Sequence, residues 1–304
     1  MQEYFLNKEI TIEVTNRCGA KCVMCPRELL TQKLDVMKNE LFFKLVEEAN
    51  ELGIEVIDLC GYGDVFLDRD LFTKIKYAKK INPKFKVYIS TTGNVMREKY
   101  FEEILEYVDI LKFSIYGNTK KTYENVMGGI KFEKSIKNIL KFIDFDKNSK
   151  VYTMGNFIIM PDVKHEMKRW INYWEPKLSE VYVWKPHNYT FGRNYRNITG
   201  KKQKTCGRPL EGPLNVAVDG KAHVCCFDFN KEIVVGDLNN QTIMQTLQNK
   251  EMKNIQKKHK ENDFKGLLCE NCDQTVKDDS VLVYKSNPKR IVGMSNSSLY
   301  VFKE

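Results

Sequence analysis

The chain lacks the marks of a secreted or membrane-spanning protein. No apolar run reaches the roughly 18 residues that a membrane-spanning helix needs, and the N-terminal run MQEYFLNKEI has no apolar signal core. It also contains no internal repeats, no low-complexity linker and no arginine-rich, aromatic-interleaved stripe, so nucleic-acid binding is not indicated. We therefore expect a cytoplasmic protein with no membrane or nucleic-acid partner, whose net charge of +9 reflects a solvated, lysine-rich surface.

The composition is that of an ordinary globular protein. Its 304 residues are 42% hydrophobic and 29% charged, which is enough for one sizeable core and a smaller appended domain. Nine cysteines are present. In a reducing compartment they are expected to be cluster or metal ligands rather than disulfides.

Six extended apolar runs alternate with amphipathic helical patterns between residue 9 and about residue 190. The expected strands are 9–14, 54–60, 85–90, 110–115, 151–160 and 180–184. Six β–α units imply parallel strands with right-handed crossovers, too few for a closed eight-stranded barrel. The sequence therefore predicts an α/β fold, an open partial (β/α)6 barrel, with functional groups at the carboxyl ends of the strands.

The character of the chain changes after about residue 195. Asp219–Gly220, between two alternating runs, predicts a β-hairpin, and a lysine-rich helix is expected over about 241–260. Residues 273–304 are expected to form an irregular tail. We predict a barrel domain over 1–195 and a small C-terminal auxiliary cluster domain over 196–304.

Three cysteines near the N-terminus, in the run CGAKCVMC, are the most informative feature. Cys18, Cys22 and Cys25 offer three thiolates from one loop, whereas a cubane 4Fe–4S cluster has four irons, so one iron stays open. The alternative is a zinc site, although zinc ligands usually come in two pairs. The spacing after a strand resembles the radical SAM family, in which the open iron chelates S-adenosylmethionine.

The turns that follow the next three strands resemble the corresponding turns of that family. In the first, the glycines permit a tight turn, and the resemblance implies that the backbone and Asp64 hold the methionyl ammonium. The second resembles a region near the ribose. In the third, Tyr116 and Met127 depart from the family pattern. The predicted cofactor-binding residues are Gly61, Gly63, Asp64, Thr92, Asn94 and Ser114.

The resemblance implies a reaction. S-adenosylmethionine is cleaved reductively to methionine and a 5′-deoxyadenosyl radical, which abstracts hydrogen from an unactivated C–H bond. A flavodoxin or ferredoxin is the expected reductant.

A second set of cysteines resembles the twitch or SPASM type of auxiliary domain. On that match a second 4Fe–4S cluster is held by Cys206, Cys225, Cys269 and Cys272. Four thiolates would also satisfy a structural zinc. Cys226 is left over and, because adjacent strand residues face opposite sides, should turn away from the cluster. It is either a hydrogen-atom donor to a substrate radical or a buried small hydrophobe. Cys60 is expected in the core.

The segment from Trp184 to Arg193 resembles a further run of twitch and SPASM enzymes. It makes His187 a candidate proton acceptor and Arg193 a candidate clamp or base near the substrate. Both could equally be structural groups in the crossing between the domains.

Three reactions fit these features. The first, slightly favoured, oxidises a secondary alcohol of a small polar substrate such as a sugar or aminocyclitol. The second is epimerisation with Cys226 as hydrogen donor. The third is maturation of a peptide. A zinc-stabilised, non-enzymatic binding module is the remaining alternative.

Overall fold

The computed structural model describes residues 8–277 and 280–288. Six strands lie side by side and parallel in chain order, which confirms the predicted alternation. They are β1 (Glu9–Ile12), β3 (Val56–Asp58), β4 (Lys86–Thr91), β5 (Ile110–Ser114), β7 (Tyr152–Ile158) and β8 (Glu180–Trp184). Two very short strands, β2 (Lys21–Cys22) and β6 (Met127–Gly128), pair with each other outside this sheet.

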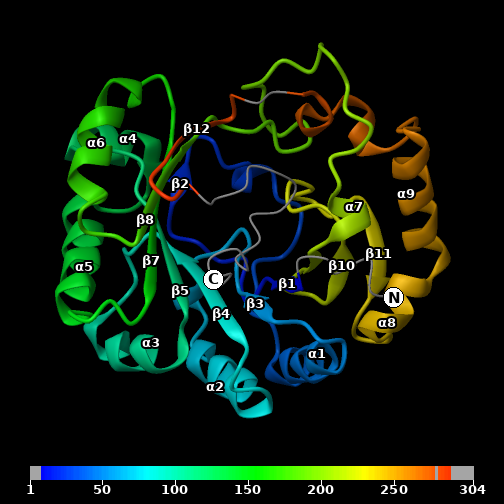
Figure 1. Ribbon diagram of the computed structural model, residues 1–304, viewed down its shortest axis with the longest axis horizontal. Coiled ribbons are helices and arrows are strands. Elements are labelled where there is room, and N and C mark those ends of the chain that lie inside the picture. The colour runs from blue at the N-terminus through cyan, green and yellow to red at the C-terminus, as the bar shows by residue number, and fades with distance from the viewer. Residues whose placement is uncertain (1–7, 278–279, 289–304) are drawn as a thin grey trace.

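Helices cover the outer, convex face of the curved sheet (Figure 1). They are α1 (Asn39–Glu51), α2 (Leu71–Ile81), α3 (Phe101–Tyr107), α4 (Lys120–Val126), α5 (Phe132–Phe145) and α6 (Met167–Trp174). Short 3₁₀ helices lie at Arg27–Leu29, Val65–Leu67, Glu98–Tyr100, Lys164–Glu166, Leu268–Asn271 and Asp273–Thr275. In the described part of the chain, no helix is both long and apolar enough to cross a membrane.

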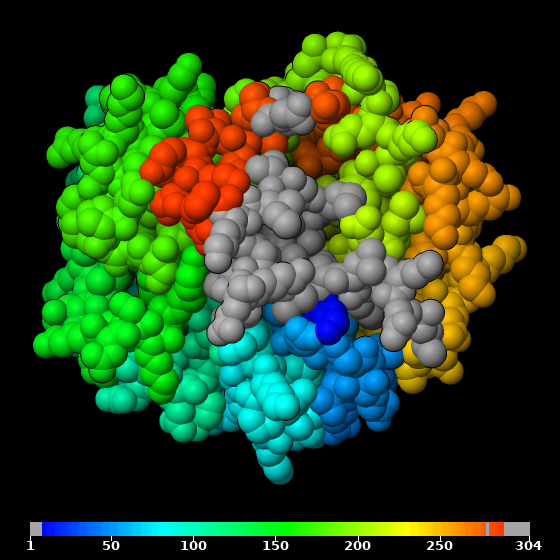
Figure 2. Space-filling model, viewed as in Figure 1, coloured from blue at the N-terminus to red at the C-terminus, as the bar shows by residue number. Residues whose placement is uncertain are grey.

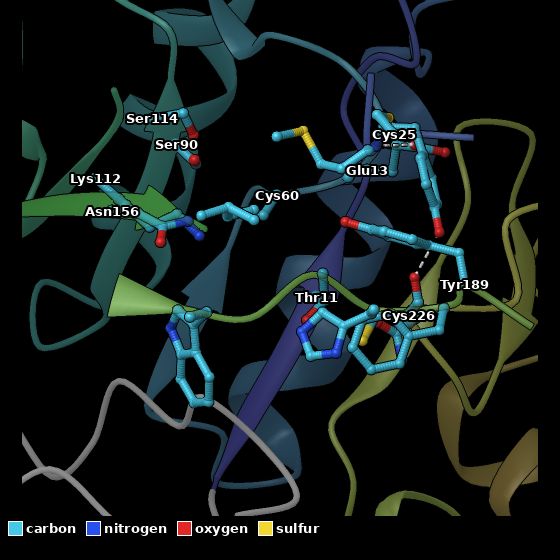
Figure 3. Close-up of a pocket in the computed structure, with 18 of the residues that line it drawn as sticks. Thr11, Glu13, Cys25, Cys60, Ser90, Lys112, Ser114, Asn156, Tyr189 and Cys226 are labelled. Atoms are coloured by element: carbon cyan, nitrogen blue, oxygen red, sulfur yellow. Dashed lines mark hydrogen bonds between the residues drawn. The ribbon is translucent and has the colours of Figure 1, made fainter. Parts of the chain in front are cut away.

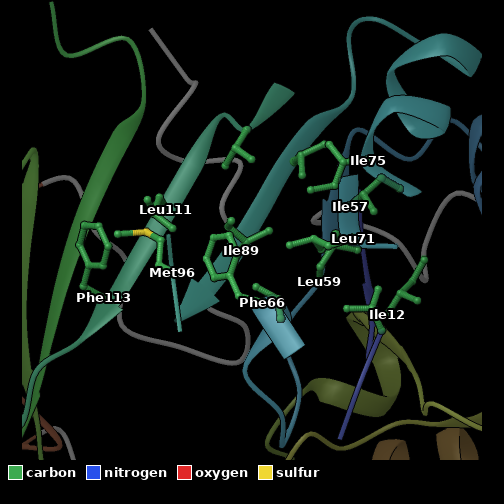
Figure 4. Close-up of a cluster of buried hydrophobic side chains, with 14 of the residues drawn as sticks. Ile12, Ile57, Leu59, Phe66, Leu71, Ile75, Ile89, Met96, Leu111 and Phe113 are labelled. Atoms are coloured by element: carbon green, nitrogen blue, oxygen red, sulfur yellow. The ribbon is translucent and has the colours of Figure 1, made fainter. Parts of the chain in front are cut away.

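The two faces of the sheet have opposite chemistry. Because side chains alternate along a strand, every second residue packs against the helices. These outward residues form the apolar core drawn in Figure 4, which includes Ile12, Ile57, Leu59, Ile89, Leu111 and Phe113. The alternate, inward residues are mostly polar, among them Thr11, Asp58, Ser90, Lys112, Ser114 and Asn156. A full barrel normally fills this interior with bulky apolar side chains, so a polar interior indicates a binding cavity.

The C-terminal region extends the same sheet. The predicted hairpin is present as β9 (Leu214–Val216) and β10 (Lys221–His223), joined through Gly220 at φ +87°, and β11 (Val234–Asp237) pairs with β10. Since β9 pairs in parallel with β1, the sheet is continuous across the boundary proposed at residue 195. That boundary stays a prediction.

One predicted helix is divided in two. The stretch expected over about 241–260 forms α8 (Ile243–Gln248) and α9 (Lys250–Glu261), beside the one-turn helix α7 (Arg208–Glu211). The break falls at Asn249, whose backbone is extended and whose Oδ1 accepts the N–H of Met252 at 2.8 Å. An asparagine that caps a new helix is a sufficient reason for the break. In Figures 1 and 2, α8 and α9 lie on the side of the molecule away from α5 and α6.

The prediction of an irregular tail is wrong in one stretch. Residues Leu282–Lys285 form β12, which pairs antiparallel with β8 at the far edge of the sheet. The rest of the predicted tail beyond residue 288 lies outside the described residues.

Candidate cofactor and substrate site

A cavity of about 770 Å³ lies inside the curved sheet. It is bounded by the inner faces of the six parallel strands, the loop after β1 and part of the C-terminal region, and Figure 3 shows its lining. Most of the predicted site residues line it: Cys18, Cys22, Cys25, Gly61, Gly63, Asp64, Thr92, Ser114, His187, Cys206 and Cys226. The structure thus brings together residues that lie as far as 208 positions apart in the chain (226 − 18).

The loop after β1 carries three of the predicted iron ligands. The N–H of Ala20 points to the Cys18 sulfur at 3.4 Å, and the N–H of Cys25 donates to the Cys22 carbonyl at 3.0 Å. Burial raises the pKa of the Cys25 thiol to about 11, and it raises the pKa of Cys22 as well. Iron binding would therefore displace protons from this loop.

The donor set of this loop fits an iron–sulfur cluster. All three donors are sulfur, and they face the large cavity. Within the described ranges, no three cysteine, histidine or acidic side chains converge on a position that would hold a single metal ion. A cubane does not require such convergence, because each thiolate binds a different iron.

Two glycines allow the turn after β3 to approach the loop after β1. A Cβ at Gly63 would lie 2.0 Å from the carbonyl oxygen of Thr15, and a Cβ at Gly61 would lie 2.5 Å from Cγ of Glu13. The N–H of Tyr62 donates to Oε1 of Glu13 at 2.7 Å and fixes the turn. Gly63 is therefore required by close packing against backbone atoms, and Gly61 by close packing against the Glu13 side chain.

Asp64 differs from its predicted role. Its carboxylate accepts hydrogen bonds from the Thr91 hydroxyl at 3.0 Å and from both the N–H and the hydroxyl of Thr92, at 3.0 and 2.9 Å. Burial raises the pKa of Asp64, and these hydrogen bonds oppose the rise. Because the chain's own donors occupy both oxygens, Asp64 joins the turns after β3 and β4 rather than offering a free carboxylate to an ammonium group.

Asn94 also differs from its predicted role, since it does not line the cavity. Its Oδ1 accepts the N–H of Lys131 at 3.2 Å, just before α5. Its neighbour Thr92 does line the cavity, as does Ser114 at the end of β5. Thr92, unlike Asn94, is therefore placed where it could meet a ligand in the cavity, and a role near the ribose stays a prediction.

The C-terminal cysteines divide between two cavities. A second, smaller cavity is lined by all four predicted ligands of the auxiliary cluster, Cys206, Cys225, Cys269 and Cys272. Cys226 is absent from that lining and faces the main cavity instead, whereas Cys206 lines both. Burial raises the pKa of Cys269 and of Cys272 to about 12. Four sulfur donors around one small cavity fit a cluster ligated entirely by the chain.

The backbone of Cys226 is hydrogen-bonded to the turn after β3. The hydroxyl of Tyr62 donates to the carbonyl oxygen of Cys226 at 2.8 Å. Nζ of Lys231 lies 5.3 Å from the centre of the Tyr62 ring and 3.5 Å from Oε2 of Glu13. The position of Cys226 is therefore set by residues of both predicted domains.

His187 is held neutral, with its proton-accepting nitrogen occupied. Gln274 Nε2 lies 3.2 Å from Nδ1 of His187 and 2.8 Å from an Asp273 carboxylate oxygen, while its Oε1 lies 3.4 Å from Nη2 of Arg208. These partners orient the Gln274 amide, so Nδ1 accepts and Nε2 carries the proton. Burial and the charges of Arg196 and Arg208 hold the pKa of His187 well below its usual range. The predicted proton acceptor is placed better as a hydrogen-bond donor.

Arg193 lies outside the lining of the cavity. Its Nε donates to the Val23 carbonyl at 3.0 Å, its Nη2 donates to the Cys25 carbonyl, and it pairs with Glu28 at 2.7 Å. Arg193 is thus a positioning residue for the loop of N-terminal cysteines rather than a clamp or base near the substrate.

The sequence analysis expected cavity-lining residues at the strand ends, Asn156 among them, but it missed Glu9, Asp58 and Lys112 on the inner face of the strands. Lys112 lies beside Tyr88 and Tyr182, and the buried Asp58 is close to Glu9. Asn156 Oδ1 is buried without a hydrogen-bond partner on the cavity wall. Cys60, expected in the core, also lines the cavity. The available signal was the polar residue at alternate positions of otherwise apolar strands.

Comparison with protein families identifies the class. The model of the radical SAM superfamily matches residues 12–173, just over half of the chain, so the protein belongs to that superfamily. The model of the SPASM iron–sulfur cluster-binding domain matches residues 206–273. As a radical SAM enzyme with this domain, the protein uses S-adenosylmethionine with a 4Fe–4S cluster and carries an auxiliary iron–sulfur cluster. The zinc alternatives and the binding-module alternative are thereby set aside.

Curated relatives match less than half of the chain. The tungsten-containing aldehyde ferredoxin oxidoreductase cofactor-modifying protein of Pyrococcus furiosus is 26% identical over 141 residues, covering 44% of this chain and 39% of that protein. A probable GTP 3′,8-cyclase of Archaeoglobus fulgidus is 26% identical over 133 residues, covering 43% of each protein. The chain thus spans about two fifths of the length of these relatives.

Solved structures match across both regions. BtrN in complex with AdoMet and 2-DOIA has a TM-score of 0.63 at 19% identity, with 93% of this chain and 100% of that chain covered. SuiB from Streptococcus suis, bound to its precursor peptide SuiA, has a TM-score of 0.68 at 11% identity and covers 84% of this chain and 67% of that chain. At these identities the likeness shows a shared fold.

Proposed function

We propose that this protein is a radical SAM epimerase that inverts a hydroxyl-bearing carbon of a small polar substrate, such as a sugar or an aminocyclitol. The observation that carries the proposal is the position of Cys226, a thiol outside the proposed ligand sets that lines the same cavity as Cys18, Cys22 and Cys25. Figure 3 shows Cys25 and Cys226 at separate places on the cavity wall.

The residues of the cavity divide by task. Cys18, Cys22 and Cys25 would hold the first cluster, and the turns at Gly61–Gly63 and Thr92 would hold S-adenosylmethionine. When bound, these groups supply a primary carbon radical that removes a hydrogen atom from a C–H bond. A wall of hydroxyl, amide, ammonium and carboxyl groups suits a polyhydroxylated substrate.

Cys226 completes the reaction in this proposal. The substrate carbon loses one hydrogen atom and receives another from the S–H bond of Cys226 on the other side, so composition is kept and configuration inverts. The sulfur left on Cys226 then takes one electron and one proton, from a flavodoxin or ferredoxin and from solvent. The neutral His187 ring would donate a hydrogen bond to a substrate oxygen.

Solvent deuterium tests this assignment. The anaerobic enzyme would be incubated in D₂O with 2-DOIA and a panel of inositols and free hexoses, and the products examined by mass spectrometry and NMR. Wild-type enzyme should place one deuterium at the inverted carbon. Cys226→Ala should still release 5′-deoxyadenosine but form no inverted product. Cys60→Ala is the control, because Cys60 also lines the cavity and lies outside the proposed ligand sets, and it should behave as wild type.

Oxidation of a secondary alcohol to a ketone is the second candidate. It is favoured by Cys206, which lines both cavities, so an electron acceptor at the auxiliary site would adjoin the substrate. The alcohol carbon would lose a hydrogen atom, and the resulting radical would lose one proton and one electron. A product two hydrogens lighter, free of deuterium and still formed by Cys226→Ala, would replace the epimerase assignment with this one.

A further inference from the structure

Arg208 is a partly buried cation with an unusual set of neighbours. It is the first residue of α7, two positions after Cys206, and it lines both the main cavity and the smaller one. Its Cζ lies 4.7 Å from the centre of the Phe227 ring, and its Nη2 is 3.4 Å from Oε1 of Gln274. Both of these partners are neutral.

No carboxylate of the described residues lies within ion-pair distance of Arg208. The other two arginines of this region do have such partners, since Arg193 pairs with Glu28 at 2.7 Å and Arg196 with Asp273 at 3.5 Å. A guanidinium withdrawn from water needs a compensating negative charge.

Cysteine sulfurs take the place of that carboxylate. Arg208 lines the main cavity together with Cys226 and Cys206, and it lines the smaller cavity together with Cys206, Cys225 and Cys272. Three of these four belong to the proposed ligand set of the auxiliary cluster. As thiolates they would carry the negative charge that Arg208 faces.

We propose that Arg208 is the counter-cation of the auxiliary iron–sulfur site and that its charge raises the reduction potential of the cluster held there. Reduction adds one electron and therefore one negative charge to the cluster. A fixed positive charge nearby stabilises the reduced state more than the oxidised state. The inference rests on the proposed ligand set and does not depend on which substrate is used.

A full-length background isolates the auxiliary cluster. Replacement of Cys18, Cys22 and Cys25 by alanine removes the three proposed N-terminal ligands, so the remaining signal comes from the C-terminal site. After anaerobic reconstitution this parent should hold about four irons per chain, as one cubane requires. A parent without iron would refute the ligand set, and the role of Arg208 with it, while leaving the role of Cys226 untouched.

The comparison is between loss and retention of the charge. Three variants are made in this background. Arg208→Gln keeps a polar side chain beside Gln274 but removes the cation, whereas Arg208→Lys keeps the cation. Lys253→Gln, the matched control, removes an exposed cation of α9. The reduced fraction of the cluster would be followed by EPR during a redox titration. At the midpoint of the parent, Arg208→Gln should have a ratio of reduced to oxidised cluster about tenfold lower, which is about 59 mV for one electron.

The two control variants should titrate as the parent does, since one keeps the charge and the other removes a charge that solvent screens. A parental midpoint in iron-loaded Arg208→Gln would overturn the proposal. So would a shift in Arg208→Lys as large as that in Arg208→Gln, or loss of iron from Arg208→Lys, because packing rather than charge would then be what Arg208 provides.

Discussion

The close approach at Gly63 yields a sharp stability prediction. In Gly63→Ala the new Cβ would meet the Thr15 carbonyl oxygen at 2.0 Å, the Thr15 carbonyl carbon at 2.7 Å and the Arg17 carbonyl oxygen at 2.9 Å. All three atoms are backbone, so no side-chain rotation relieves the overlap. The loop after β1 and the turn after β3 must separate by more than about 1 Å to restore ordinary contact.

Two costs add up in this variant. Overpacking costs about 1–3 kcal/mol, and a rigid backbone contact belongs at the upper end. Separation also breaks the hydrogen bond from the N–H of Asp64 to the Arg17 carbonyl, now 2.9 Å, for about 1 kcal/mol more. We expect the free energy of unfolding to fall by about 3–4 kcal/mol, together with loss of iron from the adjacent cysteine loop.

Gly19→Ala is the matched control within that loop. Its Cβ would meet only Cγ2 of Ile130, at an ordinary 3.8 Å. Urea unfolding and iron analysis of anaerobic protein should place this variant within about 0.5 kcal/mol of wild type. If Gly63→Ala matches Gly19→Ala in both measurements, the two loops do not need the close approach.

Three further predictions concern other residues. Arg193→Met should lose iron from the N-terminal cysteine loop to a chelator several-fold faster than wild type, because the Arg193 guanidinium donates to carbonyls of that loop. The urea midpoint should be unchanged. Equal rates of iron loss in the two proteins would refute this role. Lys74→Met should lower the free energy of unfolding by about 3–5 kcal/mol, because it leaves the fully buried Asp68, now 2.7 Å from Lys74 Nζ, without its cation. The double variant Lys74→Met/Asp68→Leu should recover part of that loss. A double variant as unstable as Lys74→Met would contradict the pairing. Burial lowers the pKa of His259 to about 4, so on acidification the unfolded chain binds a proton at this residue before the folded chain does. Between about pH 6.5 and pH 4 the free energy of unfolding should therefore fall by on the order of 2 kcal/mol more in wild type than in His259→Gln. Parallel pH profiles of the two proteins would refute this role of His259.

Local pattern was sufficient for much of the fold. The six parallel strands, the hairpin at Asp219–Gly220 and the end of α1 follow from short-range signals. Gly53, for example, has φ +70° just after α1, the left-handed conformation in which glycine commonly ends a helix. Strand β12 escaped detection because its pairing with β8 is long-range and its edge position needs no strong apolar alternation.

The sequence by itself determined the class of protein and predicted its sulfur donors, because Cys18, Cys22 and Cys25 have a spacing that one loop can present to a cluster. It also predicted that Cys225 and Cys226 face different sides, but the strand alternation on which that prediction rested is absent, because β10 ends at His223 and both cysteines follow it. Only the tertiary structure decided what each polar side chain meets. Asp64 accepts hydrogen bonds from Thr91 and Thr92, and Arg208 lines the smaller cavity among cysteines. Such partners come from different strands and loops, and a hydrogen bond or an unpaired charge exists only once folding has brought them within a few ångströms of each other.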